Sequence, residues 1–436
     1  MRSFVASQRA SKMRGSSFAL AVALAMGTAV GVTGFAEPAH AAKKEKKAKS
    51  EYSKEFIAAY KPIEEAFNTE GADLAALKGQ FPTLVSLSQS ADERFATGNL
   101  LYNAGVKTQD QTLQLQGMEL MLGSGKVAPE QAGQFNFVAY QLAYAGKQNE
   151  KARAYLQKAM DANYANERVS AADLQAAMAE TYLSEGRHEE GVRVLTDAIA
   201  ARKAAGLPVE ENWYQRGLSV AYNNKVQPAV YDVIAVWLAD YPSEANWRDS
   251  VNIARNLNDF QSDEMLDLLR LSYRVNAMKN KVEYIDFIDA ADPRKLPKEV
   301  EMIIEKGYSS GLVSKDDIYV SDSLKTAKGR IASDRAELPS LERDARASSA
   351  SLRTVIAAGD AFLSYGEYAK AEEFYRKGLG MPGAAAAQTQ TRLGIALTEQ
   401  GKYDAALEAF GKVDGRRAAI ARLWSTYVHQ KMGHGG

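Results

Sequence analysis

The feature that most constrains this fold is an internal repeat near the C-terminus, in which equivalent residues are 35 positions apart. A turn glycine, an aromatic residue, a small residue and a second aromatic residue recur in the same order. A unit of this length cannot bury an apolar face alone, so it is stabilised by stacking against its neighbours. The equivalent pairs are Gly366 and Gly401, Tyr368 and Tyr403, Ala371 and Ala406, and Tyr375 and Phe410.

The residue types in the repeat predict two helices packed closely against each other. Small residues such as Gly359 and Gly394 let two helix backbones approach, and large side chains such as Phe362 fill the groove between them. Gly366 stands where the first helix must end, because glycine tolerates the left-handed conformation there. Strand-like alternation is scarce after the first 50 residues, and prolines lie mostly between the apolar-periodic segments. We therefore predict an all-α chain of antiparallel helices.

The two C-terminal units resemble the tetratricopeptide family, whose repeat of about 34 residues reads L-G-x2-Y, then A-x3-F, then P. The step from a small to an aromatic residue is Ala371 to Tyr375 in one unit and Ala406 to Phe410 in the next. The resemblance implies a right-handed superhelical solenoid of tetratricopeptide-like helix pairs. It also implies that the first helix of each pair lines a concave groove that cradles a peptide or a partner helix.

Earlier units match the motif less fully, with spacings nearer 40 residues. Gly105, Gly146 and Gly186 each end a helical pattern, at intervals of 41 and 40 residues. The resemblance therefore covers 352–413 firmly, 91–242 moderately and the rest of the chain weakly.

These patterns predict a degenerate repeat array over 51–315, a charged connector over 316–350, and a C-terminal repeat pair over 351–432. The connector is rich in charge and has no recognisable repeat. We expect a solvated long helix or a mobile connector there, and an independent domain is the alternative. Apolar residues on one face of 416–431 predict a terminal capping helix.

The first 41 residues have the pattern of a cleavable signal peptide. Basic residues precede an uncharged apolar run from Phe18 to Phe35, and Ala39-His40-Ala41 provides small residues at a peptidase site. An uncleaved membrane anchor is the competing interpretation, because the run is nearly long enough to span a bilayer. Residues 42–50 form a basic leader, expected to be disordered, with an electrostatic tether as the alternative. Cleavage predicts a periplasmic or secreted protein without stable membrane insertion.

Charge balance and missing motifs argue against several classes of function. The chain has 54 Lys and Arg against 54 Asp and Glu, whereas a nucleic-acid binder shows a basic excess. It has no cysteine, so disulfides and thiolate metal sites are excluded. His188-Glu189-Glu190 begins like a zinc-protease motif, but Val192 stands where the second histidine is required. We expect no catalytic residue, metal site or cofactor, and an unrecognised active site in a cleft is the alternative.

The expected function is a non-catalytic scaffold that binds a peptide or partner protein in a concave helical groove, in envelope assembly or secretion. One alternative is an accessory subunit that associates with peptidoglycan or another glycan. Another is a membrane-tethered assembly factor that retains its N-terminal apolar segment. The family's register places eight partner-binding candidates on groove-facing positions of first helices. They are Tyr140, Glu180, Arg216, Asn223, Arg353, Asp360, Gln388 and Thr391.

Overall fold

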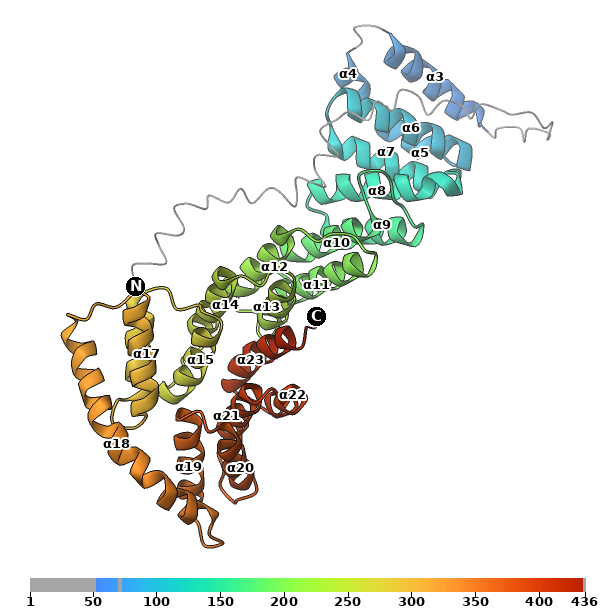
Figure 1. Cartoon of the computed structure of the whole chain (residues 1–436). Helices are drawn as coiled ribbons and strands as arrows, with labels where there is room; N and C mark the ends of the chain where they lie inside the picture. Colours follow the sequence, from blue (N-terminus) through green and yellow to red (C-terminus); the bar gives the residue numbers. More distant parts are fainter. Residues whose placement is uncertain (1–51, 70–72, 434–436) are drawn as a thin grey trace. The chain divides into compact units, whose positions relative to one another are not determined.

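The computed structural model describes residues 52–69 and 73–433, and over these residues it confirms the expected all-helical fold (Figure 1). Among the described residues, an isolated bridge between Asn166 and Val169 is the sole β-type pairing. No helix in the described part is long and apolar enough to cross a membrane. The expected signal peptide over 1–41 and basic leader over 42–50 lie outside the described residues.

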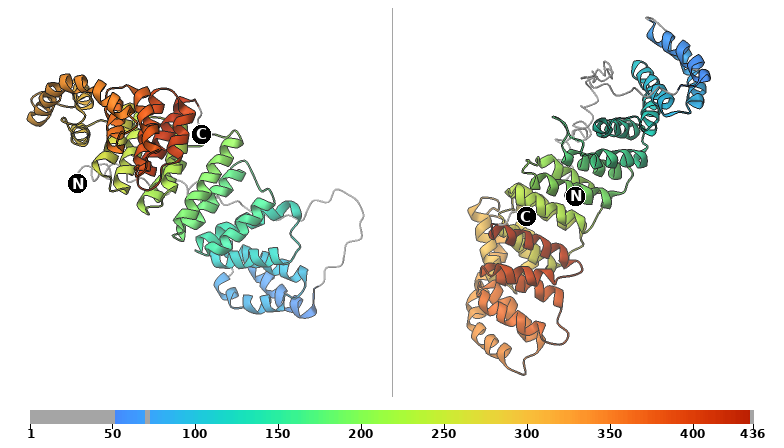
Figure 2. Two further views of the ribbon diagram at one scale, coloured as in Figure 1. Left: turned by 90° about the horizontal axis from the view of Figure 1, so that it is seen from below. Right: turned by 90° about the vertical axis from the view of Figure 1, so that its right-hand side faces the viewer.

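The chain divides into two compact units, unit 1 up to Val209 and unit 2 from Glu210 onward. In each unit, successive helices pack on one another, so that each is a helical repeat-like array (Figure 2). The division does not fall at the connector expected over 316–350, because that segment lies within unit 2.

In its described residues, unit 1 begins with α3 and two short helices, α4 and α5, which three helix hairpins follow, α6 with α7, α8 with α9, and α10 with α11. The helices are α3 (Lys54–Asn68), α4 (Leu74–Lys78), α5 (Phe81–Leu87), α6 (Ala91–Lys107), α7 (Gln111–Gly123), α8 (Pro129–Ala145), α9 (Asn149–Asp161), α10 (Ala171–Ser184) and α11 (His188–Ala204).

The three glycines that were expected to end helices in unit 1 have different roles. Gly186 has a φ of +79° and follows α10, as predicted. Gly146 caps α8, but the left-handed residue there is Lys147. Gly105 lies inside α6, where a Cβ atom would come within 2.7 Å of Gln114, so close packing of α7 explains this glycine.

A buried carboxylate joins the first helix of unit 1 to α6. Glu93, in the first turn of α6, accepts hydrogen bonds from the backbone N–H groups of Ser53, Gln89 and Ser90 at 2.7, 2.9 and 2.8 Å. Ser53 is the N-cap of α3 and Ser90 is the N-cap of α6. The Glu93 carboxylate therefore accepts hydrogen bonds from backbone N–H groups at the start of both helices.

Unit 2 runs from α12 to α23 and contains the repeat from which the sequence analysis began. Its helices are α12 (Glu211–Asn223), α13 (Ala229–Asp240), α14 (Glu244–Leu257), α15 (Ser262–Arg274), α16 (Lys281–Ala291), α17 (Pro297–Ser309), α18 (Ile318–Arg346), α19 (Leu352–Ser364), α20 (Tyr368–Leu379), α21 (Ala386–Glu399), α22 (Tyr403–Gly411) and α23 (Arg417–Lys431).

The repeat forms two helix hairpins, α19 with α20 and α21 with α22, packed as the residue types predicted. A Cβ atom at Gly359 would lie 2.7 Å from the ring of Tyr375, and one at Gly394 would clash with Phe410. Both glycines are therefore required by the close approach of an aromatic side chain. Gly366 has a φ of +76°, which confirms its position at a helix end.

The segment expected to be a connector is mostly one helix of 29 residues, α18. Val320 and Ala327 near its start belong to the apolar cluster of α16 and α17. Ala345 near its end is buried, and Lys377 of α20 donates a hydrogen bond to its carbonyl oxygen at 2.7 Å. The helix is thus packed at both ends, and most side chains between them are exposed.

The C-terminal helix α23 does more than cap the last repeat. It packs on α21 and α22, as expected, and also on α13, α14 and α15. Gln430 donates a hydrogen bond to the carbonyl oxygen of Leu238 at 2.7 Å and accepts one from Trp247 at 3.2 Å. The packing contacts of unit 2 therefore form a closed circuit. They run from each helix to the next between α13 and α23, and α23 packs back against α13, α14 and α15 (Figure 2).

Candidate functional site

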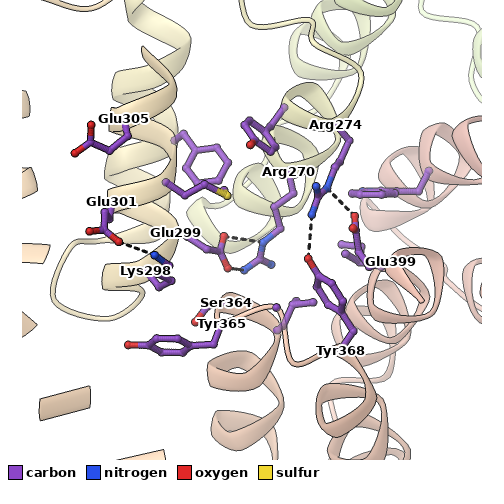
Figure 3. Close-up of a pocket in the computed structure, with 17 residues that line it drawn as sticks. Arg270, Arg274, Lys298, Glu299, Glu301, Glu305, Ser364, Tyr365, Tyr368 and Glu399 are labelled. Atoms are coloured by element: carbon purple, nitrogen blue, oxygen red, sulfur yellow. Dashed lines mark hydrogen bonds and ion pairs between the residues drawn. The ribbon is translucent and has the colours of Figure 1, made fainter. Parts of the chain in front are cut away.

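Unit 2 contains a pocket of about 550 Å³ that is lined by residues of seven helices and one turn. Helices α15 and α17 form two walls, and the turn between α19 and α20 forms a third (Figure 3). Side chains from α16, α21 and α23 complete the lining. Because these elements are distant in the sequence, the pocket exists only in the folded unit.

Arg270 of α15 lies against the α17 wall in a fully paired arrangement. Its guanidinium donates to both carboxylate oxygens of Glu299, at 3.0 and 2.5 Å, and to Asp267 at 2.6 Å. Burial opposes the charge of Arg270, but the two carboxylates outweigh burial and raise the pKa of the guanidinium. Figure 3 shows this ion pair between α15 and α17.

One helical turn later, Arg274 links α15 to α20 and α21. Its guanidinium lies 2.7 Å from Glu399 and donates a hydrogen bond to the Tyr368 hydroxyl at 3.0 Å. Burial raises the pKa of Glu399 above its usual range, although Arg274 opposes this shift. The spacing of four residues places Arg270 and Arg274 on one face of α15, which explains why both reach the pocket.

The α17 wall and the turn after α19 combine charges that are at least partly exposed with aromatic surface. On α17, Lys298 pairs with Glu301 at 2.7 Å, and Glu305 pairs with Lys328 of α18 at 2.8 Å. Tyr365, in the turn after α19, donates its hydroxyl to Asp334 at 2.6 Å, and burial together with this carboxylate raises the pKa of the tyrosine.

Behind the pocket, α15, α21 and α23 meet in a buried charge cluster centred on Asp267. The carboxylate of Asp267 is fully buried and lies 2.6 Å from Arg270, 2.6 Å from Arg417 and 3.4 Å from Arg392. Burial disfavours its charge, but the three guanidinium groups outweigh burial and lower the pKa of Asp267. Arg392 also pairs with Asp360 of α19 at 2.7 Å.

The pocket combines aromatic rings with charges held in preformed pairs, an arrangement suited to recognition. Tyr273, Tyr365 and Tyr368, which are partly exposed, offer rigid amphipathic surface, which contacts a ligand at a small cost in side-chain entropy. Among the residues that the structure describes, no group of three or more His, Asp or Glu is arranged to hold a metal ion.

Two of the eight predicted partner-binding residues are buried, so their expected orientation was wrong. Tyr140 is 2% exposed in the core of unit 1, where its ring stacks on Tyr144 and lies at a tilt to Phe137. Thr391 is also buried, and its hydroxyl donates to the carbonyl oxygen of Ala387 at 2.6 Å. The helix register of the tetratricopeptide family placed both side chains outside the seam between the two helices of a repeat, whereas in the structure they are buried.

Two further candidates are half-buried and form hydrogen bonds within unit 2. Asp360 accepts hydrogen bonds from Arg392 and from the Tyr375 hydroxyl, each at 2.7 Å. Gln388 donates to Asp263 at 3.1 Å. These side chains join helices of unit 2, and neither lines the pocket.

The remaining four candidates lie on the surface or partly exposed, and none lines the pocket. Asn223 and Arg353 are exposed, and the Asn223 amide donates to Ser219 at 3.3 Å. Arg216 and Glu180 are half-buried, the first in unit 2 and the second in unit 1. None of the six candidates in unit 2 therefore belongs to the pocket of that unit.

The sequence contained one signal for the pocket that the groove assignment did not use. Tyr365 and Gly366 form the turn of the first C-terminal repeat unit and Tyr368 begins the helix after it, and the glycine and Tyr368 both recur in the next unit. The residues of α15 and α17 have no repeat motif around them. The sequence therefore did not indicate that they lie next to the turn between α19 and α20.

No protein-family model matches this chain, and no protein of curated function is similar to it in sequence.

Proposed function

We propose that this chain is a non-catalytic scaffold of tetratricopeptide-like helix pairs, wound as a right-handed superhelix, that holds a segment of a partner protein in the unit 2 pocket. The repeat spacing and the hairpins α19–α20 and α21–α22 support the family assignment. The signal-peptide pattern of residues 1–41 supports action in the periplasm or outside the cell, in envelope assembly or secretion.

The observation that carries the proposal is the composition of the pocket. Its volume of about 550 Å³ fits several side chains of a bound segment. Half-buried aromatic rings such as Tyr365 can pack against apolar side chains of that segment, and the charged pairs at the rim can exchange hydrogen bonds with its backbone and polar groups. The charged side chains of the pocket form ion pairs with one another. Such pairs are better suited to binding a ligand than to catalysing a reaction on it.

A glycan is the second candidate ligand, favoured by the two half-buried tyrosines Tyr365 and Tyr368 on one side of the pocket. Tyrosine rings can stack on the apolar face of a sugar while neighbouring carboxylates accept bonds from its hydroxyl groups. This is the accessory-subunit alternative, in which the scaffold associates with peptidoglycan. The membrane-tethered alternative concerns residues 1–41 and is compatible with either ligand.

Site-specific photo-crosslinking in the native host tests the proposal. A photoreactive phenylalanine analogue replaces Tyr365 in the pocket, and the same analogue at Tyr319, an exposed tyrosine of α18 outside the pocket, is the control. We expect a protein adduct, identified by mass spectrometry, at position 365 and not at 319. A glycan adduct at 365 would favour the second candidate, and equal protein adducts at both positions would contradict a pocket-specific partner.

A further inference from the structure

Helix α23 holds unit 2 closed through contacts between residues that are very distant in the sequence. Arg417 lies 2.6 Å from Asp267, and the two are 150 positions apart. Gln430 contacts Leu238 across 192 positions, and Arg422 contacts Asp232 across 190. The hairpins α19–α20 and α21–α22 pack mainly on their neighbours in the chain, and they also contact Asp263, Asp267 and Arg274 of α15.

The long sequence separation adds an entropic cost to the contacts that close the circuit. Helix hairpins form from local contacts, whereas contacts over long separations must overcome the entropy of closing a long loop. A short segment, residues 412–416, connects α22 to α23, and Gly415 within it has a φ of +62°. The helix can therefore leave α13, α14 and α15 by a change at one turn while the hairpins persist.

The buried charge cluster determines how α23 docks. The Arg417 side chain is 6% exposed and bonds to Asp267 and Asp263, whereas the neighbouring Arg416 side chain is 51% exposed. Buried charges are tolerated only when partners are placed accurately, so a shifted α23 would leave Asp267 without one of its three guanidinium partners. The cluster thus selects a single docked position for the helix.

The same helix contributes a wall of the pocket. Trp424 of α23 is fully buried, stacks on Phe410 with ring centroids 6.2 Å apart, and donates its indole N–H to the carbonyl oxygen of Asp267 at 3.0 Å. It also lines the pocket, beside Ile395 of α21. If α23 undocked, this wall would be lost and the buried charge cluster around Asp267 would be exposed to water.

We propose that α23 is a clasp, which opens as a unit while α12 to α22 stay folded, and that the pocket is complete only when the clasp is closed. Its significance for partner binding rests on the function proposed above. The opening itself is a property of the chain alone, so it can be tested without the partner.

Amide hydrogen exchange on the full chain tests the opening. We expect the amides of α23 to exchange at least tenfold faster than those of α20 and α21. Arg417→Met should accelerate exchange in α23 by a further tenfold or more and leave α20 unchanged, whereas Arg416→Met, the matched neighbour, should change neither. Equal exchange in α23 and α20, or equal acceleration of both by Arg417→Met, would overturn the clasp.

A second experiment tests the opening in a variant in which the charge cluster around Asp267 is intact. The chain has no cysteine, so Asp232→Cys with Arg422→Cys allows a short bifunctional maleimide to join α13 to α23 specifically. The cross-link should slow exchange in α23 to the rate of α20. If α23 exchanges as fast with the cross-link as without it, α23 does not open by leaving α13.

The effect on the pocket is measured by photo-crosslinking at position 365. Arg417→Met should reduce the protein adduct at least tenfold, and Arg416→Met should preserve it. An undiminished adduct in Arg417→Met, with α23 open by exchange, would show that the pocket does not need the clasp. If no adduct forms in any variant while exchange shows opening, the proposed function fails and the clasp stands.

Discussion

The guanidinium of Arg417 lies 2.6 Å from the buried carboxylate of Asp267, although 150 residues separate them in the sequence. This contact makes unit 2 different from an open array in which each repeat touches only its neighbours. Changes in the last helix should therefore affect α13 to α15, and changes in α15 should affect α23.

Removing the centre of the charge cluster should destabilise unit 2 strongly. Asp267→Ala leaves Arg270, Arg392 and Arg417 in a buried site without their shared carboxylate. We expect a loss of about 3–5 kcal/mol, the usual cost of breaking a buried ion pair from one side. Urea unfolding of the full chain, followed by amide hydrogen exchange to separate the units, measures it.

The control for this experiment is Asp232→Ala. Asp232 pairs with Arg422, but both side chains are about half exposed, at 57% and 42%. An exposed pair contributes little, so the change should be within about 0.5 kcal/mol. Equal losses in the two variants would contradict the central role of Asp267.

The stability of unit 1 should depend on acid through Glu93. Burial disfavours its charge, but hydrogen bonds from Ser90, Ser53 and Gln89 outweigh burial and lower the pKa from its usual 4.5 to about 2. Because the folded-state pKa is lowered, this stabilisation is fully present above about pH 4.5 and is lost as the pH falls toward 2.

Glu93→Gln removes the ionisation and should flatten that part of the pH profile. The stability difference between wild type and variant should shrink by about 3 kcal/mol between pH 7 and pH 2. Urea titrations that follow exchange in α3 and α6 at several pH values measure this difference, with the exposed Glu130→Gln as control. A constant difference across the range would show that Glu93 is not the titrating group.

The parts of the fold that could be predicted from the sequence are those set by local patterns. Gly359 and Tyr375 lie in one repeat, so their spacing alone predicted the close helix packing that the structure has. Gly366 likewise predicted a helix end. Helix boundaries and hairpins follow from residues within one repeat, and the sequence displays those directly.

The site could not be predicted in the same way, because its residues are brought together by non-local contacts. Arg274 meets Tyr368 across 94 positions and has no repeat motif around it. The assumed groove register failed at Asp360 for a related reason. That side chain is polar, as a groove residue should be, but Arg392 and Tyr375 bind it from within the unit.

Introducing a charge at the helix seam of either repeat should destabilise unit 2. Ala371 and Ala406 are fully buried, so Ala371→Glu or Ala406→Glu overpacks the seam and buries an unpaired carboxylate. We expect a loss of about 2–4 kcal/mol for each. Hydrogen exchange should show weaker protection through α23 to α13, since α23 joins these helices, and unchanged protection in α6 to α9.

Ala369→Glu is the matched control, because Ala369 is an exposed residue of the same helix as Ala371. It should change stability by less than about 0.5 kcal/mol. Loss of protection that spread evenly into α6 to α9 would contradict the independence of unit 1.

Export by the native host should remove the N-terminal segment between Ala41 and Ala42. Ala39 and Ala41 supply the small side chains that a signal peptidase requires. The intact mass of the exported protein should correspond to a chain that begins at Ala42. Full-length protein in the membrane fraction would instead support the anchored alternative.

The last prediction separates a pocket tyrosine from a surface tyrosine with similar chemistry. Tyr365 lines the pocket and donates its hydroxyl to Asp334, whereas Tyr319 lies outside the pocket and donates its hydroxyl to Asp289. Each substitution to alanine removes one ring and one hydrogen bond to a carboxylate, so their effects on folding should be similar. Tyr365→Ala should reduce recovery of the partner at least tenfold, a loss of about 1.4 kcal/mol, because the partner loses an aromatic contact. Tyr319→Ala should leave recovery unchanged, and equal recovery with both variants would show that the partner binds elsewhere.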